Sequence, residues 1–187
     1  MLDKSMQQTT RYNSYWQTAT VITLIGGAYY WRKRRPEEQK GVAGWGLAIM
    51  ALGMGLISLE SFLGGARIIE TALFVFGAGF GIYTFGGLSL MAVMSSDEDA
   101  GAYLGLWTIS ILIFKGLGNF LGSLLRDVFL ASGLTPNASY GITFLVATIG
   151  LAASVLVLSR IDIIGFAKDY GRNQPTAEEV QAAGVEL

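Results

Sequence analysis

The sequence predicts an all-α polytopic membrane protein with about five transmembrane helices. Of its 187 residues, 52% are hydrophobic and only 14% are charged, whereas a soluble domain carries about 25% charged residues to solvate its surface. The mean hydropathy is +0.48. Five stretches are mostly apolar over roughly the 17–25 residues that a helix needs to cross the hydrocarbon core. We therefore expect much of the chain to face lipid.

The expected spans cover about residues 15–31, 42–63, 69–94, 102–125 and 140–158. The first is the weakest, because it is short and contains Gln17 and several threonines. The second carries Glu60, the third is the most uniformly apolar, the fourth contains Lys115 and Asn119, and the fifth is uncharged. Residues 15–158 thus form the expected bundle. A polar segment, 1–14, precedes it without the features of a signal peptide, and a tail, 159–187, follows and is expected to be mobile from about Asn173.

Lysine and arginine set the expected orientation, because cytoplasmic loops carry an excess of them. The loop after the first span holds five basic residues. Alternation places loop 95–100 and the tail on the same side, with eight basic residues against four on the other side. The eight are Arg32, Lys33, Arg34, Arg35, Lys40, Arg160, Lys168 and Arg172, and the four are Lys4, Arg11, Arg67 and Arg126. We expect a lumenal or periplasmic N-terminus and a cytoplasmic C-terminus, with the acidic loop 97–99 as a solvated turn.

Composition excludes several classes of function. The sequence contains no cysteine and no histidine, which removes disulfides, Cys- or His-ligated metals, and Ser-His-Asp or Cys-His catalysis. The net charge of −1 lacks the basic excess of a nucleic-acid-binding protein. The sequence pattern contains no paired acid and base, activated nucleophile or metal-ligand cluster. We therefore expect no enzymatic activity, no metal site and no nucleic-acid partner.

Glycine is abundant, at 25 residues, and its spacing indicates helix packing. The hydrophobic effect does not draw helices together in lipid, so small residues that allow close approach mark the contacts. Glycines four residues apart share one helix face, and these pairs are Gly77 and Gly81, Gly101 and Gly105, and Gly118 and Gly122. The run 77–81 lacks the preceding strand and the following Lys of a phosphate-binding loop. A broken helix that lines a cavity is the alternative.

Four ionisable side chains lie within or beside the apolar stretches: Lys115, Glu60, Arg126 and Asp127. A charge at membrane depth is costly, so each is a candidate functional group. Lys115 is near the middle of its span, and we expect it to face the bundle interior or a partner's polar group. The other three lie near span ends, where interfacial, snorkelling side chains are the simpler interpretation. Arg126 and Asp127 can pair with each other, whereas Lys115 and Glu60 differ in depth.

The fourth span begins with the sequence GAYLGLW at residues 101–107 and continues through Gly116 and Gly122 to Leu125-Arg126-Asp127. This pattern resembles the penultimate helix of the PucC family, major-facilitator-like membrane proteins linked to the assembly of chlorophyll and bacteriochlorophyll antennae. Similar stretches follow the family's order over about residues 8–158. They are Thr9-Thr10, Pro36 with residues 42–46, residues 77–81 through Phe85-Gly86 to Met91, and Gly141.

The resemblance implies that the chain corresponds to helices eight to twelve of a twelve-helix protein, most of an MFS-like C-terminal half-bundle. It agrees with the orientation above, because an even-numbered helix of that superfamily ends in the cytoplasm. Met1 would then begin part-way through the half-bundle, as a fragment or as a shortened relative. Two positions depart from the family: Ile111 stands where a Gln is frequent, and Lys115 where a small residue is usual. A pigment or substrate that used the Gln would be bound differently here.

The resemblance further implies a non-catalytic protein of photosynthetic pigment–protein complexes, either an assembly factor or a platform that delivers chlorophyll to antenna or photosystem subunits. The alternatives are a permanently docked structural or chlorophyll-binding subunit and a fragment of an MFS-type transporter, although transport needs two pseudo-symmetric halves. We expect a thylakoid or chromatophore membrane. Glycine faces without a helix of this chain predict a membrane-embedded partner. That partner would be a photosystem or light-harvesting subunit, or the N-terminal part of a PucC-like protein.

Chlorophyll or bacteriochlorophyll is the cofactor that these implications allow. Without histidine, its magnesium needs another ligand, and magnesium accepts oxygen donors. The available side chains are Asn119, Glu60 and Gln17. Trp107 is a further candidate, because a planar pigment can stack on its ring. Most tryptophans and tyrosines of the sequence nevertheless lie near span ends, as the aromatic belt of a membrane interface does.

Overall fold

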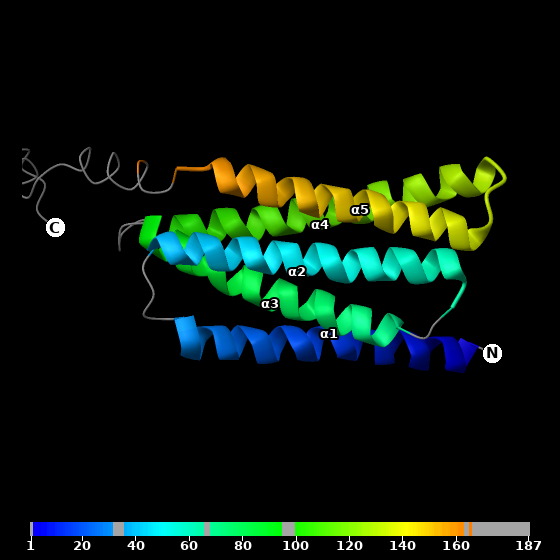
Figure 1. The fold of residues 1–187 in the computed structure, drawn as a ribbon, viewed down its shortest axis with the longest axis horizontal. Helices are drawn as coiled ribbons and strands as arrows, with labels where there is room; N and C mark the ends of the chain where they lie inside the picture. The colour runs from blue at the N-terminus through cyan, green and yellow to red at the C-terminus, as the bar shows by residue number, and fades with distance from the viewer. Residues whose placement is uncertain (1, 32–35, 66–67, 95–99, 163–164, 166–187) are drawn as a thin grey trace, which may run out of the picture.

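The computed structural model describes residues 2–31, 36–65, 68–94, 100–162 and 165. These residues form five α-helices and no strand: α1 (Leu2–Trp31), α2 (Pro36–Leu63), α3 (Ile69–Met94), α4 (Ala100–Ala131) and α5 (Pro136–Arg160). The helices lie lengthwise beside one another and alternate in direction, so α1, α3 and α5 all finish at the same end of the molecule (Figure 1). The prediction of an all-α protein is confirmed.

Within the described residues, four helical segments are long and apolar enough to span a membrane: Gln39–Leu63, Ile69–Met91, Gly101–Ala131 and Pro136–Arg160. The molecule is therefore an integral membrane protein. α1 does not reach this hydropathy, and two of its threonines, Thr20 and Thr23, donate hydrogen bonds to backbone carbonyls. Thr20 Oγ1 donates to the carbonyls of Trp16 at 2.7 Å and Gly77 at 3.0 Å, the latter on α3. Its hydroxyl is thus satisfied inside the protein, without water.

The helices extend beyond several of the predicted spans. α1 begins at Leu2, α4 runs from Ala100 to Ala131, and α5 begins at Pro136. Hydropathy marks only the part of a helix that suits lipid, whereas the helix itself ends where its backbone is capped. Before α5, the Thr135 side chain accepts a hydrogen bond from the backbone N–H of Ala138, and proline follows in the first turn, as expected of a helix start.

Some of the predicted topology lies outside the described residues: the basic residues 32–35, loop 97–99 and the tail from Asn173, together with Arg67, Lys168 and Arg172. Lys40, the remaining member of the basic cluster, is described. Its Nζ donates to the carbonyls of Ser159 at 2.9 Å and Ile161 at 2.7 Å. A cation at the C-terminal end of a helix interacts favourably with the negative end of the helix dipole. Lys40 therefore holds the end of α5 against the start of α2.

α2 and α3 pack closely along a seam of glycines. A Cβ on Gly53 would lie 2.5 Å from the backbone N of Phe76, one on Gly79 2.5 Å from that of Met50, and one on Gly86 2.6 Å from that of Ala43. Gly46 lies equally close to the backbone of Tyr83. In each contact the two residue numbers have the same sum, as an antiparallel pair in constant register requires. Small residues therefore bring these two backbones together, as in other membrane helix pairs.

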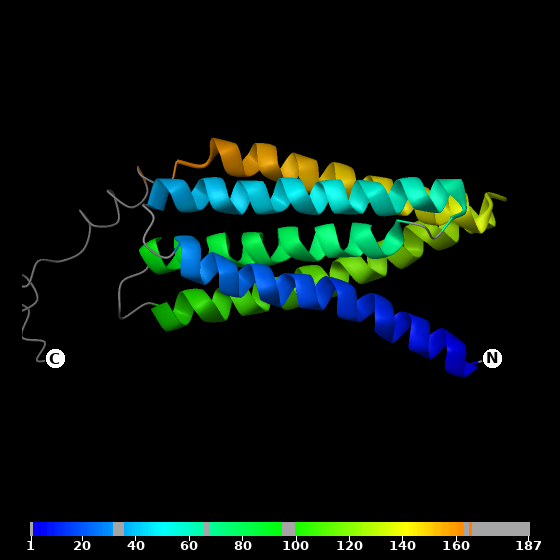
Figure 2. The same cartoon turned by 60° about the horizontal axis from the view of Figure 1, so that its bottom comes forward.

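α4 lies apart from this packed core. Among residues 101–131 none is buried, and the membrane-spanning window of α4 is 0% buried. The helix runs beside α3 and α5 (Figures 1 and 2). In contrast, α2 contributes most of the buried apolar side chains, among them Val42, Leu47, Met50 and Ile57. The molecule thus consists of a packed α1–α3–α2–α5 layer with α4 against one side of it.

Candidate functional site

One groove, of about 770 Å³, lies where α4 meets α2, α3 and α5. At its α3 wall, the rings of Tyr83 and Trp107 lie 6.1 Å apart, tilted by 33°. Gly87 makes this contact possible, because a Cβ there would lie 2.8 Å from the Trp107 ring. The hydroxyl groups in the lining of this groove belong to Tyr83, Ser110 and Ser154. We call this space the aromatic groove.

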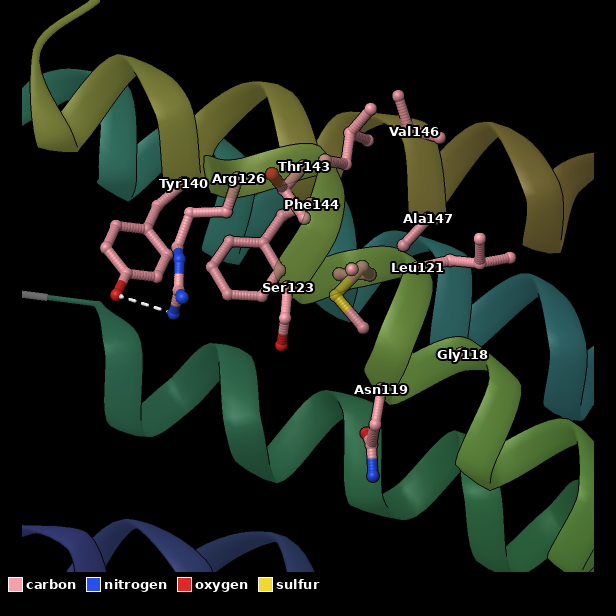
Figure 3. A pocket seen from close by; sticks show the side chains of 13 residues that line it. Gly118, Asn119, Leu121, Ser123, Arg126, Tyr140, Thr143, Phe144, Val146 and Ala147 are labelled. Carbon is pink, nitrogen blue, oxygen red and sulfur yellow. Dashed lines mark hydrogen bonds between the residues drawn. The ribbon is translucent and has the colours of Figure 1, made fainter. Parts of the chain in front are cut away.

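A second groove, of about 530 Å³, lies between α4 and α5 and includes Asn119, Ser123, Arg126, Tyr140 and Thr143 in its lining (Figure 3). We call it the Arg126 groove. It is the more polar of the two in its side chains. Phe144 stacks on Tyr140 with ring centroids 6.4 Å apart, which gives one wall an aromatic surface.

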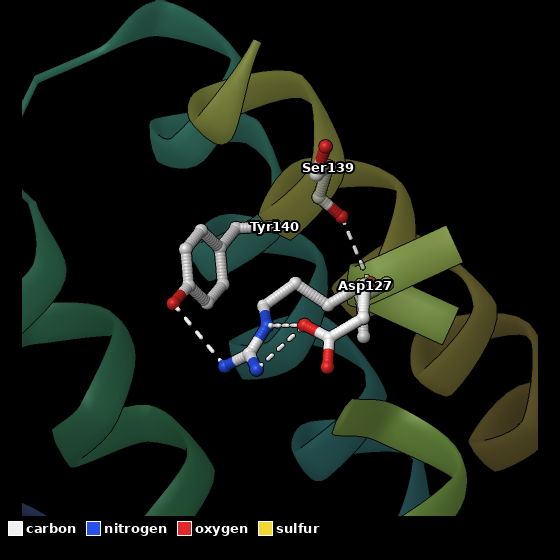
Figure 4. A network of polar contacts seen from close by, with 5 residues as sticks. Asp127, Ser139 and Tyr140 are labelled. Carbon is white, nitrogen blue, oxygen red and sulfur yellow. Dashed lines mark hydrogen bonds and ion pairs between the residues drawn. The ribbon is translucent and has the colours of Figure 1, made fainter. Parts of the chain in front are cut away.

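Arg126 and Tyr140, which line the Arg126 groove, belong to a polar network that includes Asp127 (Figure 4). The Arg126 guanidinium donates to Asp127 Oδ1 through Nε at 2.9 Å and through Nη2 at 2.7 Å. Its carbon lies 5.7 Å from the centre of the Tyr140 ring, within the range of a cation–π contact. Arg126 therefore joins α4 to α5, and its charge is already balanced by Asp127. The pair therefore offers little net positive charge to attract an additional anion.

The four candidate pigment ligands lie in different surroundings. Trp107 lines the aromatic groove and Asn119 lines the Arg126 groove. Gln17 is exposed on α1. Glu60 is only 5% exposed, and its Oε1 accepts a hydrogen bond from the backbone N–H of Ile68 at 3.3 Å. The structure therefore does not gather these side chains into one site.

Glu60 also corrects an interpretation made from the sequence. Its position near the end of an apolar stretch favoured an exposed, snorkelling carboxylate. The side chain instead turns inward and accepts a hydrogen bond from the N–H of Ile68, one residue before α3. At a helix N-terminus the dipole favours a negative charge and free N–H groups need acceptors. Glu60 thereby links the end of α2 to the residue that precedes α3.

The predicted packing glycines divide into two groups. Gly77 and Gly81 lie directly against the backbone of α1, at Trp16 and Thr20. Gly101, Gly105, Gly118 and Gly122 lie on α4, and a Cβ added at any of them would meet nothing within 4 Å. Gly118 and Gly122 line the Arg126 groove. Within the described residues, the α4 glycines therefore have no helix packed on them.

Sequence analysis missed two groups of residues. Tyr83, Ser110 and Ser154 in the aromatic groove escaped notice, although Ser110 lies three residues after Trp107 and therefore shares its helix face. The seam glycines Gly46 and Gly53, like Gly79 and Gly86, are seven residues apart, and a search for spacing four does not find them. A spacing of seven also returns to the same face of a helix, so this signal was available.

Comparison with known proteins gives one match. A family model described as PUCC protein matches residues 1–166. No curated protein and no solved structure matches the chain. The family match extends over all the described residues from α1 to α5, so it includes both grooves.

Proposed function

The chain belongs to the PucC family, and from this premise we propose that it is a non-catalytic membrane protein of photosynthetic pigment–protein complexes. It acts as an assembly factor or as a platform that delivers chlorophyll to antenna or photosystem subunits. It resides in a thylakoid or chromatophore membrane with its C-terminus in the cytoplasm. The excess of basic residues on that side of the expected topology supports this orientation.

The aromatic groove is the observation that carries the proposal. Its volume of about 770 Å³ falls within the roughly 300–1,000 Å³ of ligand pockets. Leu47, Met50, Leu90 and Phe114 make it apolar, and the rings of Tyr83 and Trp107 offer flat surfaces. A flat, apolar macrocycle suits such a space better than a small polar solute does.

The donor set of the aromatic groove fits a magnesium tetrapyrrole. Magnesium prefers oxygen ligands, and hydroxyl oxygens come from Ser110 on α4 and Ser154 on α5. The Ser154 hydroxyl donates its proton to the carbonyl of Gly150 at 2.9 Å, which leaves its lone pairs for a cation. Chlorophyll bound here would supply light absorption. The protein would hold its ring against Trp107 and exclude water.

A pigment-retention experiment tests the proposal. The protein is purified from its native membrane in mild detergent, and its absorption spectrum is compared with those of Trp107→Leu and Trp45→Leu. Trp45 is 71% exposed and lies outside the groove lining, so its replacement is the matched control. We expect pigment absorption in the wild type and in Trp45→Leu, and its loss in Trp107→Leu. A colourless wild type, or equal retention in both variants, contradicts the proposal.

The same purification separates the assembly factor from a permanently docked subunit. The uncovered glycines of α4 are compatible with an assembly factor and with a docked subunit, because each of them needs a partner protein in the membrane. Substoichiometric association with immature complexes supports the assembly factor. A fixed ratio to mature antenna or photosystem subunits supports the docked subunit.

A further inference from the structure

One face of α4 combines small and polar residues that nothing in the described structure covers. Its members recur at the spacings that return to one side of a helix. They are Gly101, Gly105, Thr108, Leu112, Lys115 and Asn119, and all of them are exposed. We call this set the Lys115 face. A Cβ added to Gly101 or Gly105 would meet no atom within 4 Å, so both positions are open.

Lys115 lies at the middle of the membrane-spanning segment. At 1.5 Å per residue, its backbone is about 21 Å from Gly101 and about 24 Å from Ala131 along α4, which are the ends of that segment. Half of the hydrocarbon core is about 15 Å thick. An ammonium group at this depth is costly when it faces lipid, and such groups normally face the interior of a bundle, where they pair with an opposite charge or a backbone carbonyl.

No carboxylate in the part of the chain that the structure describes pairs with Lys115. Among the described residues it forms no ion pair or hydrogen bond. Asp127 is bound to Arg126 at 2.7 Å, about 18 Å further along α4 at 1.5 Å per residue. Glu60 is buried beneath the start of α3, where Ile68 donates to it.

We propose that the Lys115 face docks one transmembrane helix of a partner protein, and that this helix carries an aspartate or glutamate at mid-membrane depth that pairs with Lys115. The inference rests on the proposed function, since a platform for assembly has to hold a second membrane protein. Gly101 and Gly105 allow the partner's backbone to approach closely. Thr108 and Asn119, on either side of Lys115, offer hydrogen bonds to it.

Two other occupants fit the charge less well. A second copy of this chain, related by the usual two-fold axis, would bring two Lys115 side chains together at the same depth, and like charges repel. Lipid phosphates lie at the interface, beyond the hydrocarbon half-thickness, whereas Lys115 is at its centre. A helix with a carboxylate at the matching depth meets both requirements.

A peptide-association experiment tests the inference. The purified full chain is placed in phosphatidylcholine vesicles with fluorescent transmembrane peptides that share a leucine-rich sequence and a GxxxG motif. The peptides differ at their central residue, which is Glu, Leu or Lys. We expect the Glu peptide to bind about tenfold more tightly than the Leu peptide, as interhelical polar contacts in membranes allow.

Two variants of Lys115 assign the preference to its charge. In Lys115→Met, which keeps the length of the side chain, the Glu and Leu peptides should bind equally. In Lys115→Glu, the preference should move to the Lys peptide. A wild type that binds all peptides alike, or a Glu preference that persists in Lys115→Met, overturns the inference, as does displacement of the peptide by self-association of the chain.

Two glycine variants test the close approach. Gly105→Leu adds bulk on the Lys115 face, and Gly150→Leu adds the same bulk on α5; at both positions the space within 4 Å is empty. We expect Gly105→Leu to weaken binding of the Glu peptide about fivefold and Gly150→Leu to leave it unchanged. Equal effects would place the peptide elsewhere.

The peptide assay contains no pigment and no photosynthetic subunit, so a failure of the docking face can be distinguished from a failure of the proposed function. A positive peptide result with a colourless native protein retains the docking face and rejects the pigment role. The opposite pair of results retains the pigment role and rejects the docking face.

Discussion

The seam between α2 and α3 makes a quantitative prediction for Gly79→Ala. The added Cβ would lie 2.5 Å from the backbone N of Met50, 2.8 Å from the carbonyl oxygen of Gly46 and 3.0 Å from the carbonyl carbon of Ile49. Ordinary contact begins at 3.4 Å, so the Met50 backbone has to move by about 0.9 Å, the difference between 3.4 and 2.5 Å. All three atoms belong to the backbone of α2, which cannot rotate away as a side chain can.

The cost follows from the rigidity of the two helices. When the added Cβ pushes α2 and α3 apart, a gap of about 0.5–1 Å loses about a quarter to a half of the energy of each dispersion contact along the seam. Overpacking of this kind costs about 1–3 kcal/mol of stability. The better helix propensity of alanine returns up to about 1 kcal/mol. We therefore expect Gly79→Ala to lower the free energy of unfolding by about 1–2 kcal/mol.

The assay is unfolding in mixed micelles by increasing amounts of sodium dodecyl sulfate, followed by tryptophan fluorescence. Gly150→Ala is the matched control, because a Cβ there meets nothing within 4 Å. It should leave stability unchanged or raise it by at most about 1 kcal/mol. The reasoning is refuted when Gly79→Ala is as stable as the wild type, or when both variants change stability by the same amount.

The polar contacts between elements give three more predictions. Ser58→Ala removes the hydrogen bond of 2.8 Å from the buried Ser58 hydroxyl to the Gly141 carbonyl, and should cost about 1 kcal/mol in the same unfolding assay; an unchanged midpoint would show that the bond contributes nothing. Glu60→Leu leaves the N–H of Ile68 without its acceptor and should cost about 1–3 kcal/mol, whereas Glu60→Gln keeps an acceptor and should lose less; equal losses would contradict this role. Lys40→Met frees the carbonyls of Ser159 and Ile161, so amide hydrogen exchange in the last turn of α5 should accelerate about two- to fivefold, and identical exchange in wild type and variant would count against this cap.

Much of the candidate site was visible in the sequence, but its assembly was not. Lys115 was recognisable as a mid-span charge, and the structure adds that no described carboxylate meets it. Trp107 was recognisable in the sequence as a candidate for stacking. That Tyr83 lies beside it depends on how α3 and α4 are oriented against each other, which the sequence pattern does not give. Asn119 lies in the other groove, because the face on which it lies turns away from Trp107.

The sequence by itself determined that this protein is a set of apolar helices in a membrane. In lipid, each backbone N–H and C=O must be satisfied within its own helix, so the length and hydropathy of a stretch are sufficient to predict it. Only the tertiary structure decided that Gly46, Gly53, Gly79 and Gly86 meet across one seam while the glycines of α4 meet nothing. It also decided that Glu60 is buried rather than exposed. Those outcomes depend on how each helix is rotated and shifted against its neighbours, and hydropathy contains no information about either.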